Sequence, residues 1–328
     1  MKNIMRLAIS CCIIAFVAFC LNKLNFHNFS HDISVTKAIL AVESGVFLEE
    51  TEVLDEPLAD LQSISFDTIV ESNFIPFHTP KADYTDVFID MNNQTDKTVD
   101  VSKMLLEPVD LQIQSNTNSP EILIVHTHGT ESFATDGNYT YFATIDRRST
   151  DKEVSIAKIA SILSSNLNDY GISTIYCDEY HDYPEYSGSY DRSLTSINYY
   201  LDKYPSIKMV IDVHRDAIIG NSGEHIYSTV DIDGLECAKL MFVVGTNASG
   251  LKHDNWQENL NTVVNLQAFI EQENEGIMRS INLRESRFNQ HATTGSLLLE
   301  VGTSGNTLTQ AINAINVFSK NLADYLLL

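Results

Sequence analysis

From Pro120 onward the chain alternates short apolar runs with longer amphipathic stretches, and this alternation is the feature that most constrains its fold. Apolar runs of about four to eight residues bounded by turn residues are typical of buried strands. Their interleaving with amphipathic helices predicts an α/β domain, in which helices cover both faces of an open, mostly parallel sheet. We expect strands at 121–125, 171–177, 208–213, 240–244 and 296–301, and helices at 154–167, 194–201, 256–273 and 307–327.

Three of the expected strands end in side chains that can bind a metal ion. The strand at 121–125 is followed by His126, His128 and Glu131. The strand at 208–213 is followed by His214, and the strand at 296–301 contains Glu300 near its end. In sheets of this kind functional groups gather beyond the carboxyl ends of the strands. Two histidines and a carboxylate form a common set of ligands for catalytic zinc, and a further carboxylate can serve as the base.

The residues alone leave two questions about this site open. His126 lies two positions before His128 and offers the same donor atoms, so either can be the first ligand. The alternative to a metal site is that hydrogen bonds satisfy His126 and His214 and that Glu300 pairs with a buried arginine. The convergence of three strand ends favours the metal site.

The N-terminus carries the features of an export signal. Lys2 and Arg6 precede an apolar run at 7–21 that only Ser10 interrupts. Because no cleavage site with small residues follows, we expect an uncleaved transmembrane anchor at 1–26. The flanking charges place the short N-terminus in the cytoplasm. We therefore expect a single-pass protein of the cell membrane with an extracytoplasmic catalytic domain.

The segment that follows the expected anchor is strongly acidic. Residues 31–110 contain 17 acidic and 4 basic side chains, and their apolar residues show no sustained period. This composition predicts a stalk or linker at 27–119, followed by the catalytic domain at 120–328. The whole chain has a formal charge of -23, which would repel a nucleic-acid backbone, so we expect no nucleic-acid partner. Only Cys177 and Cys237 lie beyond the anchor, too few for a disulfide framework.

Several motifs of the expected domain resemble the stage II sporulation protein P family of endospore-forming bacteria. They lie at 126–133, 181–193, 212–217, 244–247, 253–259 and 299–302. That family is similar to the wider class of zinc N-acetylmuramoyl-L-alanine amidases, whose corresponding strand ends carry a histidine, a second histidine and a glutamate. The match to that class implies His128, rather than His126, as the first ligand, together with His214 and Glu300.

The metal carboxylate is the point at which the chain departs from those amidases. In that class the carboxylate opens the next helix, a position that Asp151 or Glu153 holds here. Glu131 instead gives the His-x-x-Glu spacing of zinc carboxypeptidases. We choose His128, Glu131 and His214 as the zinc ligands, with Asp151 and Glu153 as alternatives to Glu131.

The resemblance implies a zinc-dependent peptidoglycan hydrolase. It would cleave the bond between N-acetylmuramic acid and L-alanine, and also cross-links between stem peptides, during engulfment of the forespore with stage II sporulation proteins D and M. Glu300 would act as general base and then acid. Arg215 would stabilise the oxyanion, and His126 is a further catalytic candidate.

Aromatic and basic side chains of the motifs are candidates for substrate contacts. Tyr186, Tyr190 and Trp256 can stack on sugars or stem peptides, and Arg192 can hold a carboxylate. Ordinary packing is the alternative for these residues. Two other functions also remain: a zinc peptidase restricted to stem peptides, and a non-catalytic scaffold that binds the cell wall.

Overall fold

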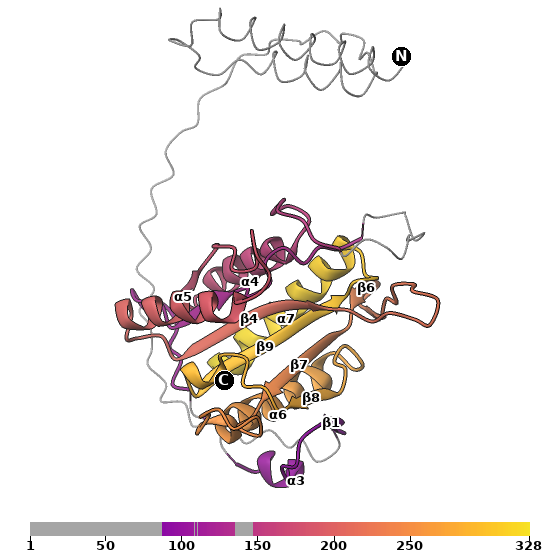
Figure 1. The fold of residues 1–328 in the computed structure, drawn as a ribbon. Helices are drawn as coiled ribbons and strands as arrows, with labels where there is room; N and C mark the ends of the chain where they lie inside the picture. The colour runs from indigo at the N-terminus through magenta and orange to yellow at the C-terminus, as the bar shows by residue number, and fades with distance from the viewer. Residues whose placement is uncertain (1–86, 108, 110, 135–146) are drawn as a thin grey trace, which may run out of the picture. The chain divides into compact units, whose positions relative to one another are not determined.

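A seven-stranded sheet organises the part of the chain described by the computed structural model, which covers residues 87–107, 109, 111–134 and 147–328 (Figure 1). The strand order is β1-β8-β7-β9-β4-β2-β3, and only the β7–β9 pair is antiparallel. The predicted mostly parallel sheet is therefore confirmed. The strands are β1 (Met91–Asn93), β2 (Ile122–Val125), β3 (Thr174–Tyr176), β4 (Met209–Asp216), β7 (Leu240–Gly245), β8 (Ile281–Arg284) and β9 (Gly295–Thr303).

Helices cover both faces of this sheet, as expected, but unequally. The helices are α3 (Val101–Met104), α4 (Ile156–Asp169), α5 (Ser189–Lys203), α6 (Trp256–Glu273) and α7 (Leu308–Leu327). Helices α4, α6 and α7 pack on one face, where they share the larger core with Ile124, Val213 and Leu299. On the opposite face α5 packs against β2, over a smaller core that contains Leu123 and Val210. On the β9 and β7 part of that second face the hydrophobic cluster consists of Met241, Val243 and Leu298, with Phe288 packed against it.

Local sequence signals explain where several of these elements lie. Strand β2 has four buried apolar residues, because a strand in the middle of a parallel sheet is covered on both faces. Helix α7 begins with a capping box, in which Thr307 and Gln310 exchange hydrogen bonds and so satisfy backbone donors at the helix start. A separate hairpin joins β5 (Thr229–Ile232) to β6 (Leu235–Ala238) through Asp233 and Gly234, both of which have positive φ.

The predicted boundary between stalk and catalytic domain needs correction. We expected residues 87–119 to belong to the linker, but β1 pairs with β8 at the edge of the main sheet and α3 packs against α6. Ile89 is buried in the larger core, and Val101 and Met104 pack against it. The folded unit therefore begins before residue 120. The high acidic content of this region concealed the few apolar residues that attach it to the sheet.

The expected transmembrane anchor at 1–26 lies outside the described residues, as does the 27–86 part of the expected stalk. Among the residues that are described, no helix has the length and apolar character needed to cross a membrane.

Candidate active site

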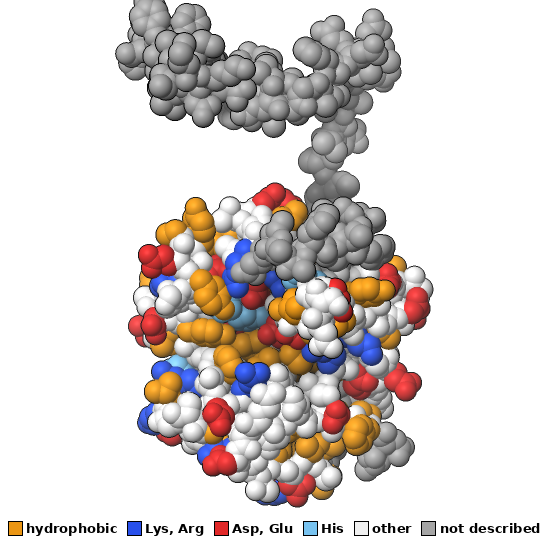
Figure 2. Space-filling model, turned by 45° about the vertical axis from the view of Figure 1, so that its right-hand side comes forward, with side chains coloured by type: hydrophobic (Ala, Val, Ile, Leu, Met, Phe, Trp, Pro, Cys, Tyr) orange, Lys and Arg blue, Asp and Glu red, His pale blue; other side chains and the backbone are white. Residues whose placement is uncertain are grey.

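The centre of the site is a row of side chains across three neighbouring strands. His214 of β4 is the register partner of Glu300 on β9, and Glu300 is the register partner of Met241 on β7. Register partners point to the same face of a sheet. Helix α5 covers only part of this face. The row lies beside the N-terminal start of that helix. Figure 2 shows a hollow in the surface where histidine, acidic and hydrophobic side chains meet.

A buried aspartate positions the imidazole of His214. Asp212 stands two residues earlier on β4, and its Oδ1 lies 3.1 Å from Nε2 of His214. The carboxylate also accepts hydrogen bonds from the backbone N–H of Thr127 at 2.8 Å and from its hydroxyl at 2.6 Å. These contacts tie the end of β2 to β4 and leave the Nδ1 of His214 facing Glu131.

Glu131 reaches the site from the turn after β2. Its Oε2 lies 3.9 Å from Nδ1 of His214 and accepts a hydrogen bond of 2.9 Å from the backbone N–H of Arg215. Burial raises the pKa of the Glu131 carboxyl, whereas His214 and Arg215 oppose that rise. The alternatives point elsewhere, since Asp151 accepts from the backbone of Glu153 and Glu153 pairs with Lys158 at 2.7 Å. The structure therefore brings Glu131, and neither alternative, beside His214.

His128 forms the third side of the site. Its ring is perpendicular to that of His214, with 5.2 Å between the ring centroids. Tyr186 stacks on His128 at 4.5 Å, and its hydroxyl lies 3.1 Å from the histidine Nε2. The Nδ1 of His128 is buried and has no hydrogen-bond partner among the described residues. The neighbouring Gly129 is required sterically, because a Cβ there would come within 2.3 Å of Nδ1 of His126.

Burial and mutual charge shift the protonation of these groups strongly. Burial and the neighbouring His214 lower the pKa of His128 to about 3. Burial also disfavours the charged form of His214, but Asp212, Glu131 and Glu300 outweigh it and raise its pKa to about 10. Burial raises the pKa of Glu300 to about 8, with His214 opposing and Glu131 adding to the rise. A carboxyl with a pKa near neutrality is suited to both accept and donate a proton.

The donor set fits a zinc ion in its chemistry. Two imidazoles and one carboxylate are typical of catalytic zinc sites, and the buried Nδ1 of His128 and Oε2 of Glu300 lack partners among the described residues. Ligands of a tetrahedral zinc ion lie about 3.3 Å apart, since each bond is about 2.0–2.1 Å long. The 3.9 Å between His214 Nδ1 and Glu131 Oε2 approaches this value. The ligand atoms of His128, Glu131 and His214 do not all lie within 4.8 Å of one another, so these side chains must move closer together to bind a zinc ion.

A second cluster of possible ligands lies after β3. Of the residues that the structure describes, Cys177, Glu179 and His181 form the one group of three donors within 4.8 Å of one another. Ser196 of α5 lies between them, with its hydroxyl 3.0 Å from His181 Nε2 and 3.2 Å from a Glu179 oxygen. The other ring nitrogen of His181 bonds to the carbonyl of His126 at 3.1 Å. This network anchors the loop after β3 to α5.

Three of the predicted residues have other roles. His126 points to the opposite face of the sheet from His214, where its Nε2 lies 2.9 Å from the hydroxyl of Tyr176. The predicted substrate contact of Trp256 is wrong, because the ring is buried at the start of α6 within the larger core. Arg192 donates to the carbonyls of Glu185, Ser187 and His181, so its guanidinium holds the loop that carries Tyr186 and is not directed at a ligand.

The remaining predicted residues lie at or beside the site. Tyr190 meets His128 edge to face at 5.4 Å and lies parallel to His214 at 6.4 Å. Tyr186 is half exposed and has the guanidinium of Arg148 over its ring at 4.4 Å. The guanidinium of Arg215 donates to the carbonyls of Arg147 and Asp216, although its backbone N–H bonds to Glu131.

The sequence interpretation missed two groups that shape the site. Asp212 shares a strand face with His214, and the Asp-x-His spacing was a usable signal for it. Phe288 and Asn289 both have positive φ, which is uncommon for residues with side chains and often marks functional regions. Asn289 donates to the carbonyl of Tyr190 at 2.7 Å, while Phe288 covers Met241. No local pattern predicted this turn.

Solved structures with a similar outline include several amidases. The CwlD amidase from Clostridioides difficile, solved in complex with the GerS lipoprotein, is 13% identical with a TM-score of 0.37 over 63% of this chain and 98% of that chain. The N-acetylmuramoyl-L-alanine amidase AmiC2 of Nostoc punctiforme is 12% identical, with a TM-score of 0.36 over 62% and 96%. Ami1 from Mycobacterium abscessus is 10% identical, with a TM-score of 0.37 over 63% and 99%. Overlaps this weak carry no weight for activity.

Sequence comparison is more informative than these overlaps. No curated protein is similar enough in sequence to match. A family model of stage II sporulation protein P, however, matches residues 72–323. The match begins before β1 and ends within α7, so it includes every residue of the His214–Glu300 row and its surroundings. The chain belongs to the stage II sporulation protein P family.

Proposed function

We propose that this protein is a zinc-dependent peptidoglycan hydrolase that cleaves the amide bond between N-acetylmuramic acid and L-alanine, and also cross-links between stem peptides, during forespore engulfment. The observation that carries this proposal is the meeting of His128, His214, Glu131 and Glu300 near the carboxyl-terminal ends of β2, β4 and β9. Family membership supports a role in sporulation. The likeness of its motifs to zinc amidases supports the substrate and the bond.

The chain's own groups supply the steps of such a hydrolysis. His128, Glu131 and His214 would hold the zinc ion, and Asp212 keeps the His214 imidazole oriented. A zinc ion there supplies Lewis acidity, which lowers the pKa of water to about 7 and polarises a carbonyl. Glu300 accepts a proton from the attacking water and passes it to the departing nitrogen. Burial raises the pKa of the Glu300 carboxyl, which favours the protonated form that donates to the departing nitrogen.

The decisive experiment digests purified peptidoglycan with the purified full-length protein. Activity should disappear with a chelator and return with added zinc, and mass spectrometry should find glycan strands freed of stem peptides. Cleavage that continues in the presence of the chelator would sink the zinc mechanism. Full lytic activity in a Glu300→Ala protein would show that Glu300 is not the proton acceptor, and no lysis by the unchanged protein would favour a non-catalytic scaffold.

A zinc peptidase restricted to stem peptides is the second candidate. The position of Glu131 beside His214 favours it, because this carboxylate gives the His-x-x-Glu spacing of zinc carboxypeptidases. The products distinguish the two functions, since a peptidase shortens or separates stem peptides and leaves an alanine on every muramic acid. Glycan strands without stem peptides would exclude the restricted peptidase.

The proposed setting of this activity is the outer face of the cell membrane. The apolar run at 7–21 supports a single-pass anchor with the catalytic domain outside the cytoplasm. Stage II sporulation proteins D and M are the proposed partners. Co-purification of the full-length protein with each of them, with and without residues 27–86, would test both the partnership and a docking role for the acidic segment.

A further inference from the structure

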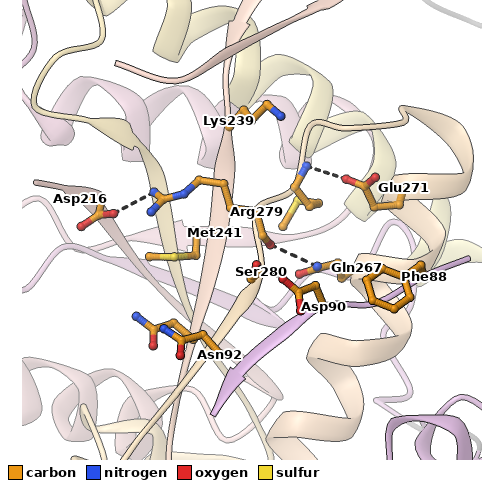
Figure 3. Close-up of a pocket in the computed structure, with 12 residues that line it drawn as sticks. Phe88, Asp90, Asn92, Asp216, Lys239, Met241, Gln267, Glu271, Arg279 and Ser280 are labelled. Carbon is orange, nitrogen blue, oxygen red and sulfur yellow. Dashed lines mark hydrogen bonds and ion pairs between the residues drawn. The ribbon is translucent and has the colours of Figure 1, made fainter. Parts of the chain in front are cut away.

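A polar pocket opens beside the reacting groups, at the β7, β8 and β1 side of the sheet. It has a volume of about 560 Å³, and Figure 3 shows the side chains around it. Two of its lining residues connect it to the candidate active site. Asp216 stands two residues after His214 on β4, and Met241 is the register partner of Glu300. The pocket therefore lies next to the catalytic row.

Charged side chains of both signs line this pocket, and they are not all paired. Arg279 donates to Asp216 at 2.8 Å, which neutralises that pair (Figure 3). The ammonium group of Lys239 has no ion-pair or hydrogen-bond partner among the described residues that line the pocket. Lys239 is thus a cation available to an anionic group of a ligand.

The pocket also holds hydrogen-bond acceptors that lack donors. Gln267 is 3% exposed, and its Nε2 donates to the carbonyl of Arg279 at 3.2 Å, which fixes the orientation of the amide. Its Oε1 is consequently an acceptor, and that atom has no partner among the described residues. The Oδ1 of Asn282 is buried and unpaired in the same way. An unsatisfied buried acceptor is unfavourable, and a hydrogen-bond donor of a ligand would remove that cost.

The carboxylate of Asp90 strengthens the preference of the pocket for a ligand donor that carries positive charge. Asp90 also lines the pocket, and one of its oxygens accepts a hydrogen bond from the hydroxyl of Ser280. With Gln267 and Asn282 it forms an acceptor side, whereas Lys239 forms a cationic side. A group that carries an ammonium and a carboxylate together satisfies both sides.

The distance between the pocket and Glu300 indicates which part of the substrate would reach the pocket. Neighbouring strands are about 4.8 Å apart, so β8 lies about 10 Å from the Glu300 strand. An extended peptide advances about 3.3–3.6 Å per residue, so about three residues cover this distance. The third residue of a peptidoglycan stem is a diamino acid, whose side chain can end in an ammonium and a carboxylate on one carbon.

We propose that this pocket binds the zwitterionic end of a stem-peptide diamino acid, with its carboxylate at Lys239 and its ammonium at Gln267, Asn282 and Asp90. This assignment rests on the proposed function, because it takes the scissile bond to lie beside Glu300. It makes the protein selective for stems whose diamino acid keeps both groups free.

The test compares two N-acetylmuramoyl-tripeptides that differ only at the third residue. One carries diaminopimelate and the other carries lysine, which lacks the distal carboxylate. The full-length protein should have about a tenfold lower KM for the diaminopimelate stem. Lys239→Met should abolish this difference and leave the lysine stem unaffected, whereas the matched control Lys203→Met, at the exposed end of α5, should keep it. Equal effects of Lys239→Met on both stems, or none on either, would overturn the assignment.

Direct binding separates failure of the pocket from failure of the proposed reaction. Calorimetry of the free tripeptides with the full-length protein needs no catalysis, and Lys239→Met should weaken binding of the diaminopimelate peptide about tenfold. Asp90→Asn should weaken both peptides, because both carry the ammonium. Lys239-dependent binding without any cleavage would refute the hydrolase and support the pocket. Cleavage of both stems without dependence on Lys239 would refute the pocket and support the hydrolase.

Discussion

Asp212 and His214 lie two residues apart on β4, with 3.1 Å between the aspartate Oδ1 and the histidine Nε2. The aspartate is buried, and two hydrogen bonds from Thr127 hold it in place. This is the arrangement of a carboxylate that orients a metal-binding histidine from behind. With Asp212 beside its Nε2, His214 presents Nδ1 to Glu131.

Replacement of this carboxylate should weaken metal binding without removing a ligand. Asp212→Asn should lower zinc affinity about 10–100-fold, because the imidazole loses the carboxylate that pairs with it. It should also bring the pKa of His214 down from about 10, since Asp212 is the main group that opposes the effect of burial there. Competition with a chromogenic chelator measures the affinity. The exposed Asp178→Asn serves as control, and an unchanged zinc affinity in Asp212→Asn would contradict this role.

Loss of the proton acceptor should separate catalysis from metal binding. Glu300→Gln keeps the size of the side chain but cannot take up a proton, so the rate of cleavage should fall about 10²–10⁴-fold. Zinc affinity should stay within about twofold of the parent protein, because Glu300 is not one of the three proposed ligands. Glu285→Gln, at an exposed position after β8, is the matched control. A large loss of zinc affinity in Glu300→Gln would instead identify Glu300 as a ligand.

The close approach at Gly129 should make this position intolerant of a side chain. In Gly129→Ala the new Cβ would lie 2.3 Å from Nδ1 of His126 and 2.8 Å from Cδ1 of Tyr180. Overpacking of this kind costs about 1–3 kcal/mol in the free energy of unfolding. Urea unfolding measures the loss. The cost of Gly129→Ala should shrink in a His126→Ala background, and strict additivity of the two changes would show that the His126 contact is not its source.

The parts of the fold that were predictable are those buried on both faces. Strands β2, β4 and β9 each contain at least three consecutive apolar residues, because parallel strands in the middle of the sheet are covered on both faces. Strand β8 was missed because its residues alternate between buried and exposed, and β1 because it is an edge strand of three residues in an acidic context. The hairpin was missed although its Asp-Gly turn was a usable signal.

The candidate site also contains residues that the sequence could identify and residues that it could not. His214 and Glu300 were identifiable because each is a polar residue at the end of an apolar strand, and the structure makes them register partners. The choice between His126 and His128 depends on which face of the sheet each side chain points to, which spacing alone did not settle. Trp256 could not be separated from a substrate contact by sequence, because an aromatic residue at a helix start serves either the core or a ligand.

A buried histidine remote from the reaction should govern part of the acid sensitivity. Burial and the nearby His291 lower the pKa of His253 from 6.5 to about 4, with Arg287 acting in the same direction. In the unfolded chain His253 therefore takes up a proton below pH 6.5, whereas in the folded protein it takes up this proton only near pH 4. Stability from this group is complete above pH 6.5 and is lost as the pH falls toward 4, by up to about 1.4 kcal/mol per pH unit.

His253→Gln should make the acid limb of the stability profile shallower, because glutamine fills a similar volume and does not titrate. Urea unfolding across pH 4 to 7, with chelator present so that metal binding does not contribute, measures the free energy of unfolding of both proteins. Their difference should be constant above pH 6.5 and should narrow progressively below it. A difference that does not change with pH would mean that His253 takes up its proton equally in the folded and unfolded states, and that its burial does not control the acid response.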